Sequence, residues 1–294
     1  VLASILSALM LFTSSSAMGG GFKAQSASSS APSWAAKAVI YQVNTRAYSA
    51  SGKFTAVTAD LPRLKKLGVN VLWLMPIHPI GVLHRKGSLG SPYSVKDYKG
   101  VNPELGTAAD LHALITAAHA SGMKVILDWV ANHSAWDNPW VTAHKSWYTQ
   151  DGNGNIIPPN PDWSDVADLN FNSQDMRAAM IDAMVYWVRD FDIDGYRADA
   201  AWGVDKAFWE SAATALRAVK PVWMVAETQD QPDLLQNAFQ ADYGWHFKDM
   251  LYLMGGGAGT KTDFATELVR MQSSYTGGSY PMLFITNHDE NSWT

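Results

Sequence analysis

Three acidic side chains follow short apolar runs that lie far apart in the sequence. Asp199 ends the stretch Gly195-Tyr-Arg-Ala-Asp199, Glu227 follows the run 222–226, and Asp289 follows the run 283–285. A short apolar run without alternation is typical of a parallel strand that is buried on both faces. Because the carboxyl ends of parallel strands meet at one edge of a sheet or barrel, we expect these three carboxylates to share one mouth.

Carboxylates gathered in one cleft raise one another's pKa, so at least one of the three should keep its proton near neutral pH. Arg197 stands two residues before Asp199, on the same side of the strand, and is expected to hold Asp199 ionised. A protonated acid beside an ionised nucleophile is the pair that retaining glycoside cleavage requires, with carboxyl groups about 5–5.5 Å apart. For Asp199 and Arg197 alone, a buried structural ion pair is the alternative.

A fourth stretch, Asp128-Trp-Val-Ala-Asn-His133, follows the apolar run 125–127 and adds a carboxylate and an imidazole to the same rim. His288 shares one feature with His133, because each follows an asparagine where a strand is expected to end. A single histidine is more often a core or loop residue. The matching positions favour a role in the site for both.

The apolar runs alternate with helical patterns along the chain. Strands are expected at residues 39–43, 69–75, 124–129, 193–198, 222–226, 247–253 and 282–286, and helices at residues 58–67, 108–120, 173–189, 206–219, 232–239 and 262–271. These repeats predict an α/β fold, a (β/α)8 TIM barrel that is C-terminally incomplete with seven strands. Without an eighth strand, the first and seventh strands would keep unpaired edges.

The chain is expected to divide into five parts. Residues 1–25 have the apolar core and small residues of a signal peptide remnant, and residues 26–36 form a Ser-rich linker. The barrel occupies residues 37–133 and 168–294, and residues 134–167, where periodicity disappears, form a small lobe (domain B) inserted after the third strand. Within this lobe, residues 151–155 begin like an EF-hand loop but are better explained as a hairpin turn.

Composition excludes several classes of function. The 294 residues are 47% hydrophobic and 17% charged, with a net charge of −5 and no basic block, so nucleic acid is not an expected partner. The apolar stretch 2–11 is too short to span a bilayer, and its signal-like character predicts a secreted or periplasmic protein. There is no cysteine for disulfides or thiol catalysis. The oligomeric state is not indicated.

Taken together, these motifs resemble those of the alpha-amylase family of glycoside hydrolases. Three further stretches are similar to that family: Asp168-Leu-Asn170 before the long helix, Ser91-Pro-Tyr-Ser-Val-Lys-Asp-Tyr98, and Val101-Asn-Pro-Glu-Leu-Gly-Thr107. The resemblance covers about residues 37–294. It implies a glycosidase that breaks α-glucosidic bonds of starch-like α-glucans through a covalent glycosyl-enzyme and needs no cofactor for the chemistry.

The resemblance also implies roles for individual residues. Asp199 matches the nucleophile, Glu227 the general acid/base, and Asp289 the carboxylate that grips sugar hydroxyls. The residues that match sugar-binding groups are Arg197, His133, His288 and Tyr93, the last as a ring stacked beneath the sugar, and Asp128 matches a structural carboxylate. Asn132 and Asp168 match ligands of a structural calcium ion, with a carbonyl near Gly203, although a further ligand from the lobe cannot be identified.

One departure from the family bears on specificity. Many members carry Lys-His three and four residues after the nucleophile, where this chain has Trp202-Gly203. Trp202 could stack on the leaving sugar instead, and strict starch specificity is in doubt. Three alternatives therefore stay open: an α-1,6-glucosidase of the same family, a transglycosylase, and a non-catalytic carbohydrate-binding protein on the same barrel.

Overall fold

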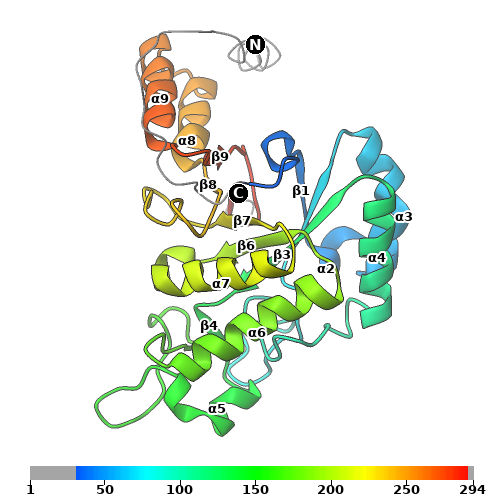
Figure 1. The fold of residues 1–294 in the computed structure, drawn as a ribbon, viewed down its shortest axis with the longest axis vertical. Coiled ribbons are helices and arrows are strands. Elements are labelled where there is room, and N and C mark those ends of the chain that lie inside the picture. Colours follow the sequence, from blue (N-terminus) through cyan, green and yellow to red (C-terminus); the bar gives the residue numbers. More distant parts are fainter. Residues whose placement is uncertain (1–30, 291–294) are drawn as a thin grey trace.

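A parallel sheet of seven strands organises the molecule. The computed structural model describes residues 31–290, so the expected leader and the first part of the linker lie outside the described residues (Figure 1). The strands pair in the order β1-β2-β3-β6-β7-β8-β9, each parallel to the next. They are β1 (Ile40–Val43), β2 (Val71–Leu74), β3 (Lys124–Val130), β6 (Gly195–Asp199), β7 (Trp223–Ala226), β8 (Ala241–Tyr243) and β9 (Tyr280–Met282).

The strands are apolar because both of their faces are covered. In β2, Val71 and Trp73 join a core inside the curved sheet with Trp223, whereas Leu72 and Leu74 join the core between sheet and helices. This division follows from the two-residue period of side chains along a strand. The expected incomplete (β/α)8 barrel is confirmed: the described strands form an open barrel with β1 and β9 at its free edges.

Helices connect the strands and cover the outside of the sheet (Figure 1). They are α2 (Thr45–Tyr48), α3 (Phe54–Lys66), α4 (Ala108–Ala120), α5 (Pro139–Ala143), α6 (Gln174–Asp190), α7 (Lys206–Val219), α8 (Trp245–Gly255) and α9 (Lys261–Ser274), with short 3-10 turns η2 (Ala35–Lys37), η3 (Lys145–Trp147) and η4 (Ala201–Gly203). Helix α6 begins as expected, because the side chain of Ser173 accepts the N–H of Met176. None of the helices in residues 31–290 is long and apolar enough to cross a membrane.

The expected strand at residues 247–253 is wrong, because this segment belongs to helix α8. Its apolar residues Phe247, Met250, Leu251 and Met254 are spaced three and four apart, which is a helical period. The sixth strand of the barrel is instead β8, only three residues long. Such a short strand gives no periodic signal in the sequence.

The expected helix at residues 232–239 is also wrong. The structure has turns there, in which Leu234 N–H bonds to Gln231 O and Leu235 N–H bonds to Pro232 O. These are bonds across three residues, and they do not continue as the four-residue bonds of an α-helix.

The last expected strand lies earlier than predicted. Strand β9 ends at Met282, and the apolar residues 283–285 continue outside the sheet. His288 and Asp289 therefore lie on a loop after β9, and Asp289 does not lie at a strand end.

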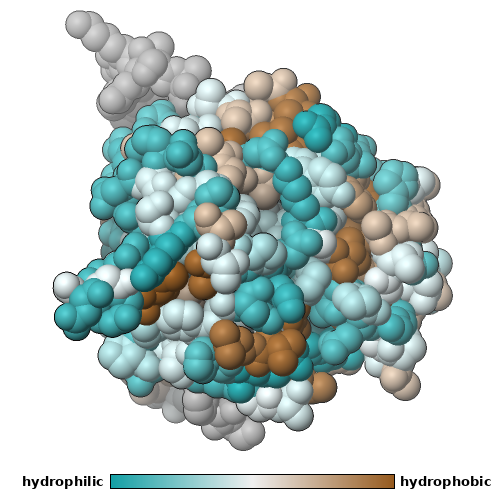
Figure 2. Space-filling model, turned by 90° about the horizontal axis from the view of Figure 1, so that it is seen from below, coloured by the Kyte–Doolittle hydropathy of each residue, from teal (hydrophilic) through white to brown (hydrophobic). Residues whose placement is uncertain are grey.

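Residues 133–168, between β3 and α6, build a small substructure of their own, in the lower part of Figure 1. It contains the antiparallel pair β4 (His133–Ala135) and β5 (Val166–Asp168), as well as α5 and η3. The hairpin turn expected at residues 151–155 is confirmed, because Gln150 pairs with Ile156 and Asp151 N–H bonds to Asn155 O. Viewed from below, the surface is mostly hydrophilic with separate hydrophobic patches (Figure 2).

Candidate active site

One cleft brings together most of the side chains that the sequence singled out. Asp199 is the last residue of β6, and Glu227 directly follows β7, the neighbouring strand. Their parallel pairing places both carboxylates at the same end of the sheet. The cleft has a volume of about 340 Å³, and its lining includes Tyr93, His133, Asp199, Trp202, Glu227, His288 and Asp289.

Arg197 contacts three carboxylates of the site. Its side chain is fully buried, and its Nη1 donates to Asp199 Oδ1 at 2.9 Å and to Asp128 Oδ1 at 2.7 Å. Nη2 lies 2.7 Å from Glu227 Oε1. One guanidinium thus touches three carboxylates, and Asp199 and Glu227 lie within the span of a single arginine head group. The two-residue spacing between Arg197 and Asp199 had predicted their contact.

Asp128 fixes the orientation of the Arg197 side chain. Its side chain is fully buried on β3, and its second oxygen accepts hydrogen bonds from Trp73 Nε1 at 3.1 Å and from the Tyr93 hydroxyl at 3.0 Å. Arg197 Nε in turn donates to the hydroxyl of Tyr243 at 3.0 Å. Each polar atom of Asp128 therefore has a partner, as a buried carboxylate requires.

The electrostatics of Asp199 differ from the expectation. Burial and the neighbouring carboxylate of Glu227 raise the pKa of Asp199 well above its usual range, and Arg197 only partly opposes this. Sequence reasoning had assigned Arg197 to Asp199 alone. Because Arg197 divides its single positive charge among three carboxylates, the free site favours holding a proton within this group of acids.

The second oxygen of Glu227 is held by the backbone. Ala200 N–H donates to Glu227 Oε2 at 2.7 Å. Ala200 itself has a φ of 43°, in the left-handed region that residues other than glycine rarely adopt. The chain thus leaves β6 abruptly after Asp199, in a strained turn whose Ala200 N–H reaches the carboxylate of Glu227.

His288 also lines the cleft and contacts both β1 and the loop that carries Tyr93. One ring nitrogen is 2.6 Å from Gln42 Nε2 and the other is 2.7 Å from the Tyr93 hydroxyl, while its ring stacks on Tyr93 at 5.5 Å. Burial and the positive charge of Arg197 lower the pKa of His288 to about 4, so the imidazole is neutral at pH 7. Asp289 is next to it, half-exposed, with Oδ1 3.3 Å from His288 Nε2, and burial raises its pKa.

An aromatic wall closes the cleft on the side of the inserted residues. The ring centroid of Trp163 is 5.6 Å from that of His133 and 6.5 Å from that of Trp202. Trp202 is 56% exposed, which leaves its ring open to a ligand. His133 is buried, and this burial lowers its pKa to about 4.

Three residues of the site were not predicted from the sequence: Gln42, Tyr243 and Trp163. Gln42 and Tyr243 are inward positions on β1 and β8 that bond to His288 and Arg197, and Trp163 is one of many scattered tryptophans. A polar residue near the end of a predicted strand could have indicated Gln42. No signal could have indicated Tyr243, because its strand was placed elsewhere.

The residues expected to hold calcium offer oxygen donors of the right kind. Asn132 Oδ1 lies 2.8 Å from where a Cβ on Gly203 would stand, so a larger residue at position 203 would displace the Asn132 side chain. Asp168 pairs with His133 across the small antiparallel sheet, and burial raises its pKa. Two side-chain donors are fewer than the roughly six to eight oxygens that calcium prefers. Within residues 31–290, no cluster of three or more acidic or histidine side chains could hold a metal ion.

Comparison with known proteins identifies relatives over most of the chain. The family model "Alpha amylase, catalytic domain" matches residues 22–292. "Alpha-amylase MalA" of Haloarcula japonica is 27% identical over 277 residues, which are 90% of this chain and 40% of the relative. An "Alpha-1,4-glucan:maltose-1-phosphate maltosyltransferase" of Mycolicibacterium smegmatis is 31% identical over 205 residues, 63% of this chain and 27% of the relative. The chain thus spans less than half of either curated relative.

A solved structure shares the fold. The crystal structure of an alpha-amylase from Lactobacillus plantarum superposes with a TM-score of 0.81 and 38% identity, over 86% of this chain and 63% of that one. The carboxylates of the cleft thus lie in a chain similar in sequence to proteins described as an alpha-amylase and a maltosyltransferase, and similar in fold to an alpha-amylase.

Proposed function

The chain belongs to the family of alpha-amylase catalytic domains, and on this premise we propose that it cleaves α-glucosidic bonds of starch-like glucans with net retention of anomeric configuration. The observation that supports this most is the shared contact of Asp199 and Glu227 with Arg197. Two carboxyls within one guanidinium's span are close enough to act on one anomeric carbon from opposite sides.

The proposed reaction has two steps. Glu227 gives a proton to the glycosidic oxygen while an ionised Asp199 attacks the anomeric carbon, so the C–O bond to the leaving sugar breaks as the bond to Asp199 forms. Glu227 then takes a proton from water, and the water oxygen displaces Asp199. The reactive form requires the proton to reside on Glu227 and not on Asp199, and Ala200 N–H together with Arg197 keeps both carboxyls in place throughout.

The remaining cleft residues are proposed to bind the attacked sugar. Asp289 and neutral His288 offer hydrogen-bonding groups to its hydroxyls, and Tyr93 presents an aromatic ring. His133 contributes a further contact from β4. Arg197 was expected to bind the sugar, but it is fully buried and does not line the cleft, so it acts by holding Asp199 and Glu227, while Asp128 positions Arg197. Trp202 is proposed to stack on the neighbouring sugar, where its exposed ring can cover the C–H face of a hexose.

Transfer to a second sugar is the alternative that a specific observation favours. The exposed ring of Trp202 could hold an acceptor sugar as well as a leaving one, and one relative is described as a maltosyltransferase. The two outcomes differ only in whether water or a hydroxyl attacks the glycosyl-enzyme. An α-1,6-glucosidase also shares this chemistry. A non-catalytic binding protein is disfavoured because all three carboxylates line the cleft.

Product analysis of the full-length protein tests the proposed function. Soluble starch, pullulan and isomaltose separate the linkages, and added maltose as an acceptor separates hydrolysis from transfer. We expect release of α-anomers from starch, and a loss of at least about 10³-fold in turnover for Asp199→Asn with an unchanged melting temperature. Turnover by Asp199→Asn at the parent rate, or release of β-anomers, would refute the proposal.

Calcium is proposed as a structural ion and not as a reactant. Asn132 and Asp168 would hold it, with backbone carbonyls and water completing its shell, and the bound charge would relieve the half-buried carboxylate of Asp168. Calcium should then raise the melting temperature of the parent but not that of Asp168→Asn. An equal effect on both proteins, or none on either, excludes this site.

Export is proposed from the apolar stretch 2–11, which lies outside the described residues. Fractionation of cells producing the full-length protein should then find it in the periplasm or the medium. Its retention in the cytoplasm would refute export.

A further inference from the structure

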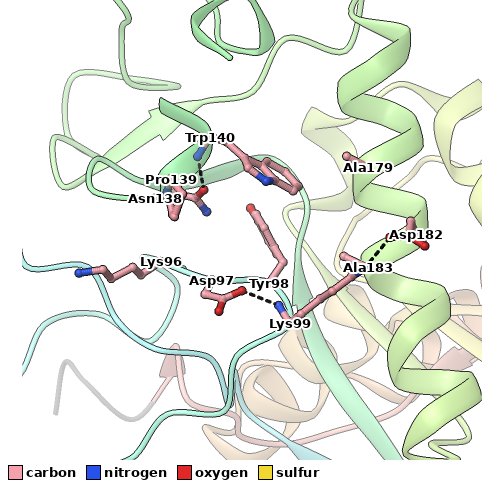
Figure 3. A pocket seen from close by; sticks show the side chains of 10 residues that line it. All are labelled: Lys96, Asp97, Tyr98, Lys99, Asn138, Pro139, Trp140, Ala179, Asp182 and Ala183. Atoms are coloured by element: carbon pink, nitrogen blue, oxygen red, sulfur yellow. Dashed lines mark hydrogen bonds and ion pairs between the residues drawn. The ribbon is translucent and has the colours of Figure 1, made fainter. Parts of the chain in front are cut away.

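A second cavity lies apart from the cleft, between the loop 96–99, the start of α5 and the side of α6 (Figure 3). We name it the α5–α6 groove. It has a volume of about 240 Å³, and none of its lining residues lines the catalytic cleft. Its lining is Lys96, Asp97, Tyr98, Lys99, Asn138, Pro139, Trp140, Ala179, Asp182 and Ala183.

The groove combines flat aromatic rings with small side chains. Trp140 of α5 is half-buried and packs 5.0 Å from the ring of Tyr98, tilted by 31°. Ala179 and Ala183 on α6 contribute only methyl groups, so the space beside the rings stays open (Figure 3). The Tyr98 hydroxyl donates to the backbone oxygen of His133 at 2.7 Å, which links the groove to a residue that also lines the cleft.

The rim of the groove is polar but has its charges paired. Lys99 Nζ lies 2.5 Å from Asp182 Oδ2, and Lys96 Nζ lies 3.0 Å from Asp137 Oδ2. Asp97 Oδ1 accepts the backbone N–H of Lys99 at 2.9 Å, and this carboxylate is exposed. The rim thus offers ammonium donors next to carboxylate acceptors, without a free cationic centre that would favour an anion.

We propose that the α5–α6 groove binds one glucosyl unit of an α-glucan outside the catalytic cleft, an inference that rests on the proposed function. A hexose has apolar C–H faces that stack on an indole, and hydroxyls that both donate and accept. The volume lies below the roughly 300–1,000 Å³ of drug-sized pockets and suits a single ring. An apolar ligand would make no use of the polar groups on the rim, and an ion would find its counter-charges already paired.

The groove gives a long substrate a second point of attachment. A chain bound at both places is held at a high effective concentration near the cleft. Short substrates that occupy only the cleft gain nothing from it. The groove should therefore affect binding of soluble starch without affecting cleavage of a short maltoside.

The test fills the groove without touching the cleft. In the full-length protein, Ala179→Met places a longer side chain into the groove from α6, and Ala178→Met makes the same change at the neighbouring, exposed position as a control. Trp140→Ala removes the ring itself. Retardation in gels that contain soluble starch measures binding, turnover of a chromogenic maltoside measures the cleft, and thermal melting confirms folding.

We expect Ala179→Met to weaken binding to soluble starch about tenfold, the size of one lost stacking contact. Maltoside turnover should stay within about twofold of the parent, and Ala178→Met should match the parent in both assays. If Ala179→Met and Trp140→Ala both turn over the maltoside and are retarded by starch as strongly as the parent, the proposed glucan binding in the groove is refuted. Retardation that depends on Ala179 without any turnover upholds the groove and refutes the proposed reaction instead.

Discussion

A single arginine determines the geometry of the candidate site at the scale of residues. Arg197 is buried, and it contacts Asp128, Asp199 and Glu227 at 2.7 to 2.9 Å. The carboxylates are thereby spaced by the fixed fork of the guanidinium. Burial, together with the excess negative charge that this arrangement leaves, raises the pKa of Asp199.

Asp128→Asn tests how this charge is shared. The carboxylate of Asp128 raises the pKa of Asp199 and also draws on the charge of Arg197. Asparagine removes that negative charge, so the pKa of Asp199 should fall. Because Asp199 must be ionised to attack, the acidic limb of the pH profile of kcat/KM should move to lower pH.

Asn172→Asp is a matched control for this profile, since residue 172 is exposed and does not line the cleft. It should leave the acidic limb unchanged. An acidic limb that stays in place or moves to higher pH in Asp128→Asn would show that Asp128 does not control Asp199.

The clustering of Asp199, Glu227 and Arg197 was predictable from sequence, whereas their surroundings were not. Arg197 and Asp199 lie at the end of β6, and Glu227 directly follows the apolar strand β7, so pattern and spacing placed them together. Tyr243 and Gln42 act through the curvature of the sheet, which brings β8 and β1 toward the same point. That closeness is a property of the whole barrel and leaves no mark on a local stretch of sequence.

Helix α8 holds the loop that carries His288 and Asp289, a contribution that belongs to the scale of elements. Trp245 packs edge-on against Phe284 at 4.9 Å, and the Tyr252 hydroxyl donates to Ile285 O at 2.5 Å. Lys248 Nζ, buried between the rings of Trp245 and Tyr252, bonds to Glu290 Oε1 at 3.0 Å. One face of the helix thus fixes the loop next to Asp289.

Lys248→Met should therefore weaken the hold on Asp289. We expect kcat/KM to fall about tenfold, because a misplaced carboxylate loses contact with the sugar in the transition state. Glu290→Gln should act in the same direction, and the double variant should be less harmful than the product of the two effects. Lys248→Arg should restore part of the activity.

Lys261→Met, on the exposed start of α9, serves as a control of equal charge and should leave kcat/KM unchanged. If the fold-changes of the Lys248 and Glu290 variants in kcat/KM multiply in the double variant, or if neither variant changes kcat or KM, the pair does not position the loop.

Long elements were predicted more accurately than short ones. The bounds of α4 and α7 match the expectation, since both carry a sustained helical pattern, and α4 begins with the capping box of Thr107 and Asp110. Strands β8 and β9 have three residues each, too few for a pattern to emerge. The expected strand in place of α8 shows the same limit: an apolar segment is ambiguous until its period is counted.

The whole molecule separates chemistry from stability at the two ends of its strands. The carboxyl ends carry Asp199 and Glu227, whereas Asp194, just before β6, lies at the opposite end. Asp194 is buried and bonds to His119 Nε2 at 2.6 Å, to Lys124 Nζ at 3.1 Å and to the N–H of Val125 at 3.0 Å. Substitutions at the two ends of the strands can thus test activity and stability separately.

Asp194→Asn should lower stability in a pH-dependent way. Burial raises the pKa of Asp194, but the hydrogen bonds from His119 and Val125 and the charge of Lys220 outweigh it and lower the pKa to about 2. A lowered pKa stabilises the fold above the unfolded value near 3.9, and this contribution is lost as pH falls from there toward 2. We expect a loss of about 2 kcal/mol at pH 7, measured by urea denaturation.

The difference between parent and variant should shrink below pH 4. Asp190→Asn, at an exposed ion pair on the end of α6, is the control and should have a far smaller effect. A pH-independent loss in Asp194→Asn would mean that its packing matters and its charge does not.

The free edges of β1 and β9 are the main feature of the fold at this scale. They border a cavity of about 560 Å³ lined by Ile40, Trp73, Trp223, Tyr280 and Phe284 among others. The repeat of apolar runs predicted this incomplete barrel, because seven strands at regular spacing survive errors in any one of them. The sequence pattern could not predict how the two edge strands β1 and β9 lie relative to each other, since no hydrogen-bonded pairing joins them in residues 31–290.

Trapping the covalent intermediate tests the central claim most directly. A glucosyl fluoride with a second fluorine on the sugar ring forms the glycosyl-enzyme readily but releases it slowly, so the full-length protein should gain the mass of one sugar. Proteolysis and mass spectrometry should then find that sugar on Asp199. A label on Glu227 or Asp289, or an active protein that gains no label, would contradict the account.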